Sequence, residues 1–166
     1  MRQISVYDVA SSTWYNVTAE GDIPMNRSAF CTALSAAPDD SSMQITMYGG
    51  YNLFAGYGFA DIHVLSIPSF QWINVTDTGN VEFGLNGGNL VGRADHACHA
   101  ATPREMISVG GVLYFGNTIV NQNTCNSSWP PIRALDLSTY TWADQYNNNP
   151  DSYYVPDAVV KVVGGK

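Results

Sequence analysis

Ile132-Arg-Ala-Leu-Asp-Leu-Ser-Thr-Tyr-Thr-Trp142 is one of three versions of the same segment in this chain of 166 residues. The other two are Ile4-Ser-Val-Tyr-Asp-Val-Ala-Ser-Ser-Thr-Trp14 and Ile62-His-Val-Leu-Ser-Ile-Pro-Ser-Phe-Gln-Trp72. All three reduce to Ile-x-x-[Tyr/Leu]-[Asp/Ser]-aliphatic-x-[Ser/Thr]-x-x-Trp. Chance does not align three tryptophans in this way, and such self-similarity is typical of repeat architectures.

A second segment alternates with the first and consists of a short apolar run that ends in a glycine doublet. Its versions are Ile45-Thr-Met-Tyr-Gly-Gly50, Met106-Ile-Ser-Val-Gly-Gly111 and Val160-Lys-Val-Val-Gly-Gly165. Before two of them lie Arg27-Ser-Ala-Phe-Cys31 and Arg93-Ala-Asp-His-Ala-Cys98. These runs are short, rich in β-branched and aromatic residues, and bounded by Gly, Pro, Asn or Asp, which predicts strands. No longer window has apolar residues at helical spacing, so we expect an all-β chain.

The glycines and tryptophans of the repeats have a structural interpretation. A glycine doublet at the end of a strand permits a positive φ or a close backbone approach that a Cβ would obstruct. We expect each tryptophan to pack between neighbouring sheets, where truncation of a core aromatic to Ala costs roughly 3–5 kcal/mol.

A unit of about four short strands with a Gly-Gly doublet and a downstream Trp resembles the kelch repeat of β-propellers. The resemblance covers essentially the whole chain, although the last unit has Tyr154-Val-Pro156 where the others have an arginine. The positions that match the repeat are Gly49, Gly50, Gly110, Gly111, Gly164, Gly165, Trp14, Trp72, Trp142, Arg27 and Arg93.

The resemblance implies a kelch-type β-propeller that is incomplete, with about three four-stranded blades of a larger ring. Because propellers close with four to eight blades, we expect the chain to be a fragment whose partners include the missing blades of the same parent chain. Two copies that assemble into one ring are the alternative. The expected divisions are a half blade over 1–26, blades over 27–78 and 93–147, and a half blade over 153–166.

The composition limits the function classes. Seven basic residues stand against fourteen acidic ones, which gives a net charge of −7, and charged residues make up only 13% of the chain. Without a basic cluster, a nucleic-acid partner is not expected. The apolar runs are too short or too interrupted to insert into a membrane within this chain. Its start reads as an alternating strand and not as a signal peptide, so it looks internal.

Sequons and cysteines point to an oxidising compartment. Asn-x-Ser/Thr acceptors occur at Asn16, Asn26, Asn74 and Asn126, for which chance in an Asn-rich chain is the alternative. Cys98 and Cys125 are the expected disulfide pair, which leaves Cys31 over, and free cytosolic thiols are the alternative.

The wider pattern also resembles the extracellular kelch region of fungal secreted or membrane-anchored proteins. That resemblance implies a location outside the cell or at its surface, with N-linked glycans. In such proteins a transmembrane helix commonly follows the kelch region.

No catalytic residue, metal ligand set or cofactor site is expected. Asp95-His96-Ala97-Cys98-His99 is the only crowded set of potential ligands, but it offers two per strand face at most, whereas structural zinc takes four. Resemblance to galactose oxidase, which shares the repeat, implies a copper enzyme as an alternative, yet only structural positions match. Sialidase boxes and other catalytic signatures are missing.

Aromatic residues in the expected insertions indicate binding. Exposed aromatics on loops commonly provide contact area for proteins or sugar rings, and loop packing is the alternative. We therefore expect a non-catalytic extracellular module that binds a protein or glycan partner on its propeller loops. The alternatives are a fragment of a galactose-oxidase-like copper enzyme and an intracellular kelch scaffold. The candidate binding residues are Tyr51, Phe54, Tyr57, Phe59 and Trp129.

Overall fold

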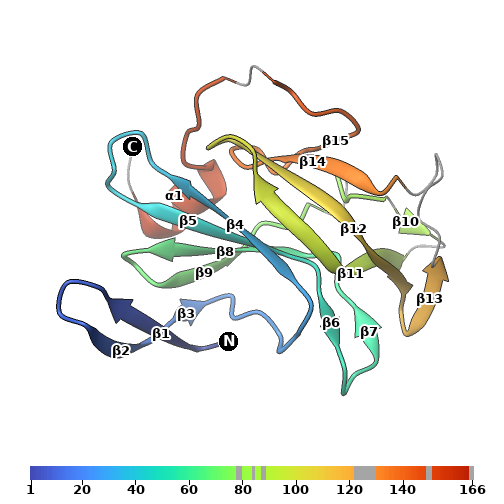
Figure 1. Ribbon diagram of the computed structural model, residues 1–166, viewed down its shortest axis with the longest axis horizontal. Coiled ribbons are helices and arrows are strands. Elements are labelled where there is room, and N and C mark those ends of the chain that lie inside the picture. The colour runs from blue at the N-terminus through green and yellow to red at the C-terminus, as the bar shows by residue number, and fades with distance from the viewer. Residues whose placement is uncertain (78–79, 84, 87–88, 122–129, 149–150, 165–166) are drawn as a thin grey trace.

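Nearly every regular element of the chain is a strand, which confirms the all-β prediction. The structure is a computed structural model, and it describes residues 1–77, 80–83, 85–86, 89–121, 130–148 and 151–164. Two large sheets and two small ones account for the strands of these residues (Figure 1).

The first large sheet contains the first complete set of repeat segments. Its four longer strands pair antiparallel, whereas β3 pairs parallel with β9. β4 alternates between buried and exposed residues, while β8 is buried along almost its whole length because both of its faces are covered. In spatial order the strands are β3 (Glu20–Gly21), β9 (Gln71–Asn74), β8 (Ile62–Ile67), β5 (Met43–Tyr48) and β4 (Cys31–Ala36).

The second large sheet repeats the same arrangement one unit later in the chain. It is antiparallel throughout, and β11 lies beside β4 of the first sheet, so the two arginine-containing repeat segments meet (Figure 1). Its strands are β10 (Leu85–Asn86), β11 (Asn89–Ala100), β12 (Glu105–Phe115), β14 (Ile132–Asp136) and β15 (Trp142–Ala143), with β13 (Thr118–Asn121) paired to β12.

The main core lies between these two sheets. The Tyr48 ring packs against the Trp142 ring, with centroids 4.8 Å apart, and β4, β5, β8 and β9 face the second sheet through their apolar side chains. The buried members are Cys31, Ala33, Tyr48, Ile62, Val64, Ile73, Met106, Leu135, Leu137, Tyr140, Trp142, Tyr153 and Val159.

A smaller core joins the first large sheet to the N-terminal segment. Trp72 is buried there with Ala19, Met47 and Leu65, and its indole N–H donates to the carbonyl of Met1 at 3.2 Å. Trp142 packs between the two large sheets as expected, whereas Trp72 packs between the first large sheet and the N-terminal segment.

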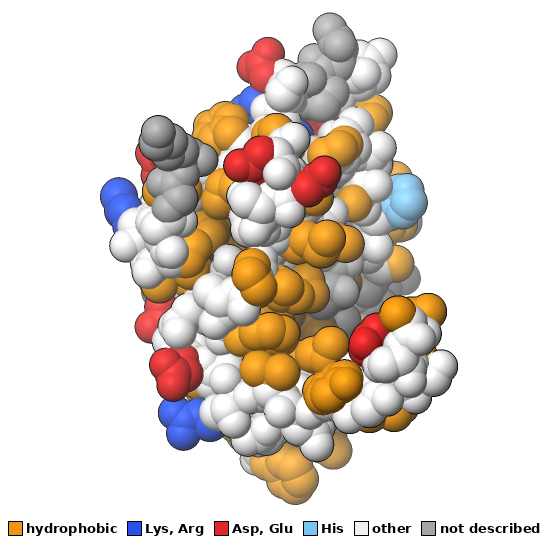
Figure 2. All heavy atoms as spheres, turned by 90° about the vertical axis from the view of Figure 1, so that its left-hand side faces the viewer, with side chains coloured by type: hydrophobic (Ala, Val, Ile, Leu, Met, Phe, Trp, Pro, Cys, Tyr) orange, Lys and Arg blue, Asp and Glu red, His pale blue; other side chains and the backbone are white. Residues whose placement is uncertain are grey.

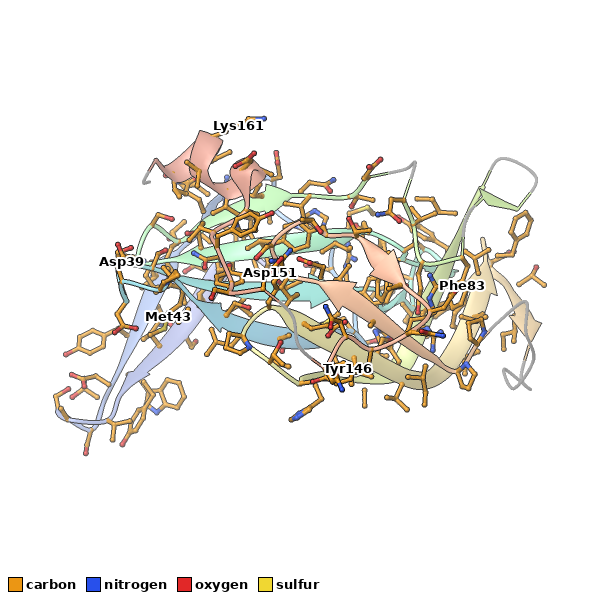
Figure 3. The ribbon with its side chains drawn as sticks, turned by 90° about the horizontal axis from the view of Figure 1, so that it is seen from above. Asp39, Met43, Phe83, Tyr146, Asp151 and Lys161 are labelled. Atoms are coloured by element: carbon orange, nitrogen blue, oxygen red, sulfur yellow. A yellow bond between two sulfur atoms is a disulfide. The ribbon has the colours of Figure 1, made fainter. Side chains whose placement is uncertain are left out.

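Trp14 differs from the other two repeat tryptophans. It lies on the hairpin of β1 (Gln3–Asp8) and β2 (Thr13–Thr18), which projects away from the large sheets (Figures 1 and 3). Its side chain is 67% exposed and contacts the Tyr7 ring at 5.0 Å. The expectation that Trp14 packs between sheets is wrong here, because the hairpin packs against the first large sheet through Ile4 and leaves Trp14 exposed.

Segment Val155–Gly165, expected as a strand, instead contains the helix α1 (Asp157–Val163). Val159 is buried in the main core and Val163 packs against it one turn later, so the run has a helical apolar face. Asp157 in the first turn and Lys161 in the last suit the helix dipole, and Lys161 points outward (Figure 3). Gly164 ends the helix at φ +76°, while Gly165 lies outside the described residues. No helix in the described part of the chain is long and apolar enough to cross a membrane.

The side of the molecule at the left of Figure 1 carries exposed apolar surface. Figure 2 shows hydrophobic side chains across the middle of this face, with charged side chains mostly around them. Large exposed apolar residues of the chain include Met43, Leu34 and Val162.

Candidate functional site

Arg27 anchors the first glycine doublet. Its fully buried guanidinium pairs with Asp61, where the Nη2–Oδ2 distance is 2.9 Å, and donates to the Gly49 carbonyl at 3.1 Å. The Phe59 ring lies 3.6 Å from the guanidinium carbon, in a cation–π arrangement.

Arg93 anchors the second glycine doublet. It is fully buried, pairs with Glu82 at 3.0 Å, and donates to the carbonyl of Gly110. It also donates to the Pro130 carbonyl at 3.0 Å. Burial raises the pKa of Glu82, and the charge of Arg93 opposes that rise. Arg27 and Arg93 are thus equivalent in position and in their contact with the first glycine of a doublet.

The first glycine doublet lies where the two sheets converge. Gly49 and Gly50 have φ values of +67° and +102°, and the Gly50 N–H donates to the Arg93 carbonyl at 2.8 Å. A Cβ on Gly49 would stand 2.3 Å from that same oxygen. Gly110, at φ +72°, would meet no described atom within 4 Å. Among the described residues, nothing covers Gly110, whereas the equivalent Gly49 is covered by Arg93.

The hairpin of β6 (Tyr51–Asn52) and β7 (Tyr57–Gly58) presents apolar side chains at its tip. Phe54 is 100% exposed and Leu53 is 76% exposed. Asn52 holds the turn, because its Oδ1 accepts from the N–H groups of Phe54 and Ala55 at 2.9 and 2.8 Å.

The base of this hairpin is fastened to the second sheet. A Cβ on Gly58 would stand 2.6 Å from the Cβ of Tyr114, and one on Gly92 would stand 2.4 Å from the carbonyl carbon of Gly58. The Tyr51 and Tyr114 rings pack with centroids 4.7 Å apart. We call Tyr51, Phe54, Tyr57 and Tyr114 the hairpin platform.

Not every predicted binding aromatic belongs to this platform. Phe59 is buried, with its ring over Arg27 and 4.9 Å from the Tyr57 ring, so its prediction as an exposed binding residue is wrong. Trp129 lies outside the described residues. Sequence reasoning missed Tyr114, which lies three residues after the second glycine doublet, whereas Tyr51 directly follows the first.

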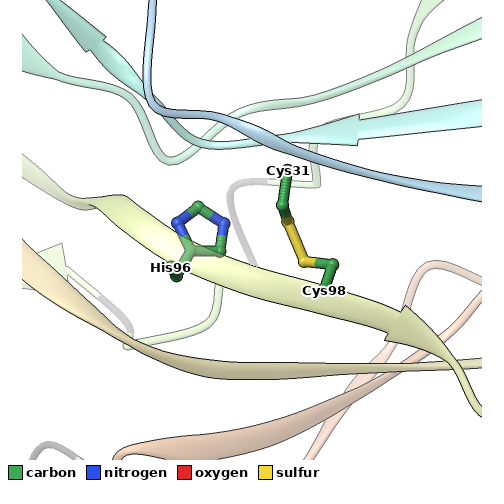
Figure 4. Close-up of side chains that lie close together, drawn as sticks. All are labelled: Cys31, His96 and Cys98. Atoms are coloured by element: carbon green, nitrogen blue, oxygen red, sulfur yellow. A yellow bond between two sulfur atoms is a disulfide. The ribbon is translucent and has the colours of Figure 1, made fainter.

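The disulfide joins Cys31 of β4 to Cys98 of β11, with a Cα–Cα distance of 5.5 Å (Figure 4). The predicted Cys98–Cys125 pair is therefore wrong, because the contact between β4 and β11 brings Cys31 to Cys98 across 67 residues of sequence. Cys125 lies outside the described residues.

His96 lies beside this disulfide (Figure 4). Its side chain is only 7% exposed, and neither Nδ1 nor Nε2 has a hydrogen-bond partner among the described residues. Burial, followed by the charge of Arg93, lowers the pKa of His96 to about 4, which leaves the imidazole neutral at physiological pH. One ligand atom each from Cys31, His96 and Cys98 lies within 4.8 Å of the others.

Three predicted glycosylation acceptors lie on the surface. Asn16 and Asn74 are exposed on β2 and β9, and Asn26 is exposed in the segment before β4. Asn126 lies outside the described residues.

A groove of about 890 Å³ lies between the end of β4, the turn from β11 to β12, and residues 151–153. Arg104 lines it and pairs with Asp136 at 2.8 Å and with Asp151 at 3.6 Å, the latter labelled in Figure 3. The sequence carried no motif that singled out this groove.

No protein-family model matches the chain. The chain is 32% identical to a kelch repeat-containing protein of Arthroderma benhamiae over 99% of its own length, and it spans about a quarter, 26%, of that relative. This similarity agrees with the two consecutive sheets, their paired arginines and their glycine doublets, although the described strands form no closed ring. The chain is therefore a homologue of a kelch repeat-containing protein, and its all-β fold is consistent with a kelch-type propeller.

Proposed function

We propose that this chain is a non-catalytic protein-interaction module, and that its partner binds the hairpin platform. The observation that carries the proposal is the full exposure of Phe54 on a hairpin whose base is held in place. Exposed aromatics on rigid mounts provide contact area at a low cost in conformational entropy, which is why few of them dominate many interfaces.

The contacts below the tip support this role. Asn52 restrains the turn from both sides, because its Nδ2 also donates to the Asn26 carbonyl at 3.0 Å. The ring contact between Tyr51 and Tyr114 links the hairpin to the second sheet. With a net charge of −7, the chain suits a partner surface that is neutral or basic.

We propose further that the chain is part of a larger propeller, with blades over 27–78 and 93–147 and a half blade over 1–26, whereas the expected half blade over 153–166 contains α1. Gly110 has no neighbour within 4 Å among the described residues, whereas the equivalent Gly49 is covered by the backbone of Arg93, and this difference supports the proposal. Another blade of the same parent chain would supply the matching contact at Gly110 and cover Trp14 at the other flank.

The compartment proposed is the cell exterior or surface, with N-linked glycans. The exposure of Asn16, Asn26 and Asn74 and the Cys31–Cys98 disulfide support it. The relative's name refers only to kelch repeats and lends no support to the copper-oxidase or intracellular alternatives. A mass shift on enzymatic deglycosylation of protein from its native source tests this assignment, and a variant with Gln in place of Asn16, Asn26, Asn74 and Asn126 together should not show the shift.

Site-specific photocrosslinking tests the interaction itself. A photoreactive phenylalanine analogue replaces Phe54 in one sample and Met43, which is exposed outside the platform, in a matched control. We expect one protein adduct from position 54 that is absent from position 43. Equal adducts from both positions, or an adduct that is a glycan alone, would contradict the proposal.

A further inference from the structure

We propose that reduction of the Cys31–Cys98 disulfide creates a buried zinc site, with both thiolates and the His96 imidazole as ligands. The three side chains come from β4 and β11, and their ligand atoms lie within 4.8 Å of one another (Figure 4). Once the disulfide is reduced, the two sulfurs would move apart to the roughly 3.8 Å that two Zn–S bonds of about 2.3 Å at a tetrahedral angle require.

The unpartnered imidazole is the observation that points to a ligand. Burial of a polar group without a hydrogen bond costs free energy, so a native imidazole with two unpaired nitrogens needs a physical explanation. His96 is 7% exposed, and neither nitrogen finds a donor or acceptor in the described part of the chain. The Tyr48 ring contacts its ring edge-on at 5.1 Å but satisfies neither nitrogen. If the two sulfurs held a cation, a coordinate bond from His96 to that cation would satisfy one of the two imidazole nitrogens.

The surrounding backbone holds His96 in this place. A Cβ on Gly49 would stand 2.9 Å from the His96 Cε1, and one on Gly111 would stand 2.8 Å from the His96 Cβ. The imidazole thus lies against the first glycine doublet, and the Cβ of His96 lies against the second.

Charge and coordination number favour Zn²⁺. Two thiolates neutralise one divalent cation, so the buried complex carries no net charge, whereas a monovalent cation would leave a buried anion. Two Cys and one His with an open fourth position is a known zinc ligand set, and Cys98 is only partly buried, which leaves a side from which water can complete the tetrahedron.

A phosphine can reduce the Cys31–Cys98 disulfide to the two thiols. A phosphine takes the oxygen of one water to become a phosphine oxide, and its two electrons and the two water protons convert the disulfide into two thiols. Zn²⁺ then binds both sulfurs and releases the two thiol protons. Under reducing conditions the cation would thus replace the covalent link between β4 and β11.

Titration of the full chain with Co²⁺ and Zn²⁺ tests the proposal. After phosphine reduction we expect one equivalent of Co²⁺ to give a thiolate-to-cobalt charge-transfer band that Zn²⁺ abolishes, and the oxidised protein to give none. His96→Gln should weaken Zn²⁺ binding at least tenfold, in a chelator competition, while His99→Gln, an exposed histidine on the same strand, stays within twofold of wild type.

Two further measurements separate a loss of Zn²⁺ binding from a loss of the fold. Circular dichroism of each reduced variant establishes that the fold persists, and addition of Zn²⁺ should raise the unfolding temperature of reduced wild type but not of Cys31→Ser. A reduced, folded protein that gives no charge-transfer band, or a His96→Gln variant that binds Zn²⁺ as tightly as wild type, would overturn the proposal.

Discussion

The carbonyl oxygen of Arg93 lies against Gly49, where it accepts the N–H of Gly50 at 2.8 Å and leaves no room for a Cβ on residue 49. This contact joins the arginine strand of one repeat to the glycine doublet of the repeat before it. Because Arg93 also donates to Gly110 in its own sheet, one residue links two successive units.

Gly49→Ala and Gly110→Ala should differ in cost although both glycines have a left-handed φ. The strained backbone costs each variant about 1–2 kcal/mol, whereas Gly49→Ala adds a collision with backbone and should lose about 3 kcal/mol or more. Urea unfolding of the two variants measures the difference. Equal losses would mean that the contact with Arg93 is not made.

Removal of the Arg93 charge should destabilise the fold, because it leaves the buried Glu82 carboxylate without its positively charged partner. Both side chains are buried, so Arg93→Met should lower the free energy of unfolding by roughly 3–5 kcal/mol. Addition of Glu82→Gln to that variant should restore part of the loss, because the uncompensated carboxylate is gone. A double-mutant cycle that shows simple additivity would argue against the pair.

The repeats allowed the strands and the core tryptophans to be predicted from sequence. Trp72 and Trp142 each stand at the same spacing after the Ile that opens the repeat segment, so their position in a sheet, and hence their burial, follows from the pattern. Arg27 and Arg93 could be matched in the same way, whereas their partners Asp61 and Glu82 come from loops of different length and carry no repeat signal.

What the pattern could not supply is which elements become neighbours. The partner of Cys98 depends on β4 lying beside β11, and no local spacing encodes that contact. The run Val159–Val163 has an apolar pattern short enough to suit a strand or a helix, so its packing decides between them. Trp14 keeps the repeat position of a core residue but stays exposed, because its hairpin packs against the first large sheet through Ile4.

The Cys31–Cys98 disulfide should be detectable by peptide mapping and should stabilise the fold. Peptide mapping without reduction should recover the Cys31 peptide linked to the Cys98 peptide, and the link should survive Cys125→Ser. Loss of a cross-link between residues 67 apart should cost about 4 kcal/mol in the chain-entropy model, measured as the difference in unfolding free energy between wild type and Cys31→Ala/Cys98→Ala. A Cys98–Cys125 peptide in the digest would contradict the arrangement of β4 and β11.

His63 should make stability fall in mild acid. Burial lowers its pKa below 6.5; Asp61, with its Oδ2 3.4 Å from Nδ1, and Asp22 oppose the shift, while Arg27 adds to it. The unfolded chain therefore takes up a proton at a higher pH than the native chain does, and the native state loses stability as the pH drops below about 6.5.

His63→Gln removes this component. Urea unfolding at pH about 7.5 and about 5 should show a smaller loss of stability for the variant than for wild type. Identical losses would show that His63 takes up its proton equally in the native and unfolded chains.

The most direct test of the interaction role is the affinity for the partner recovered by crosslinking. Phe54→Ala should weaken binding at least tenfold, or about 1.4 kcal/mol, because Phe54 is the fully exposed apolar side chain of the hairpin platform. Met43→Ala, outside the platform, should leave the dissociation constant unchanged. If Phe54→Ala binds the partner as tightly as wild type does, the hairpin platform is not the binding surface.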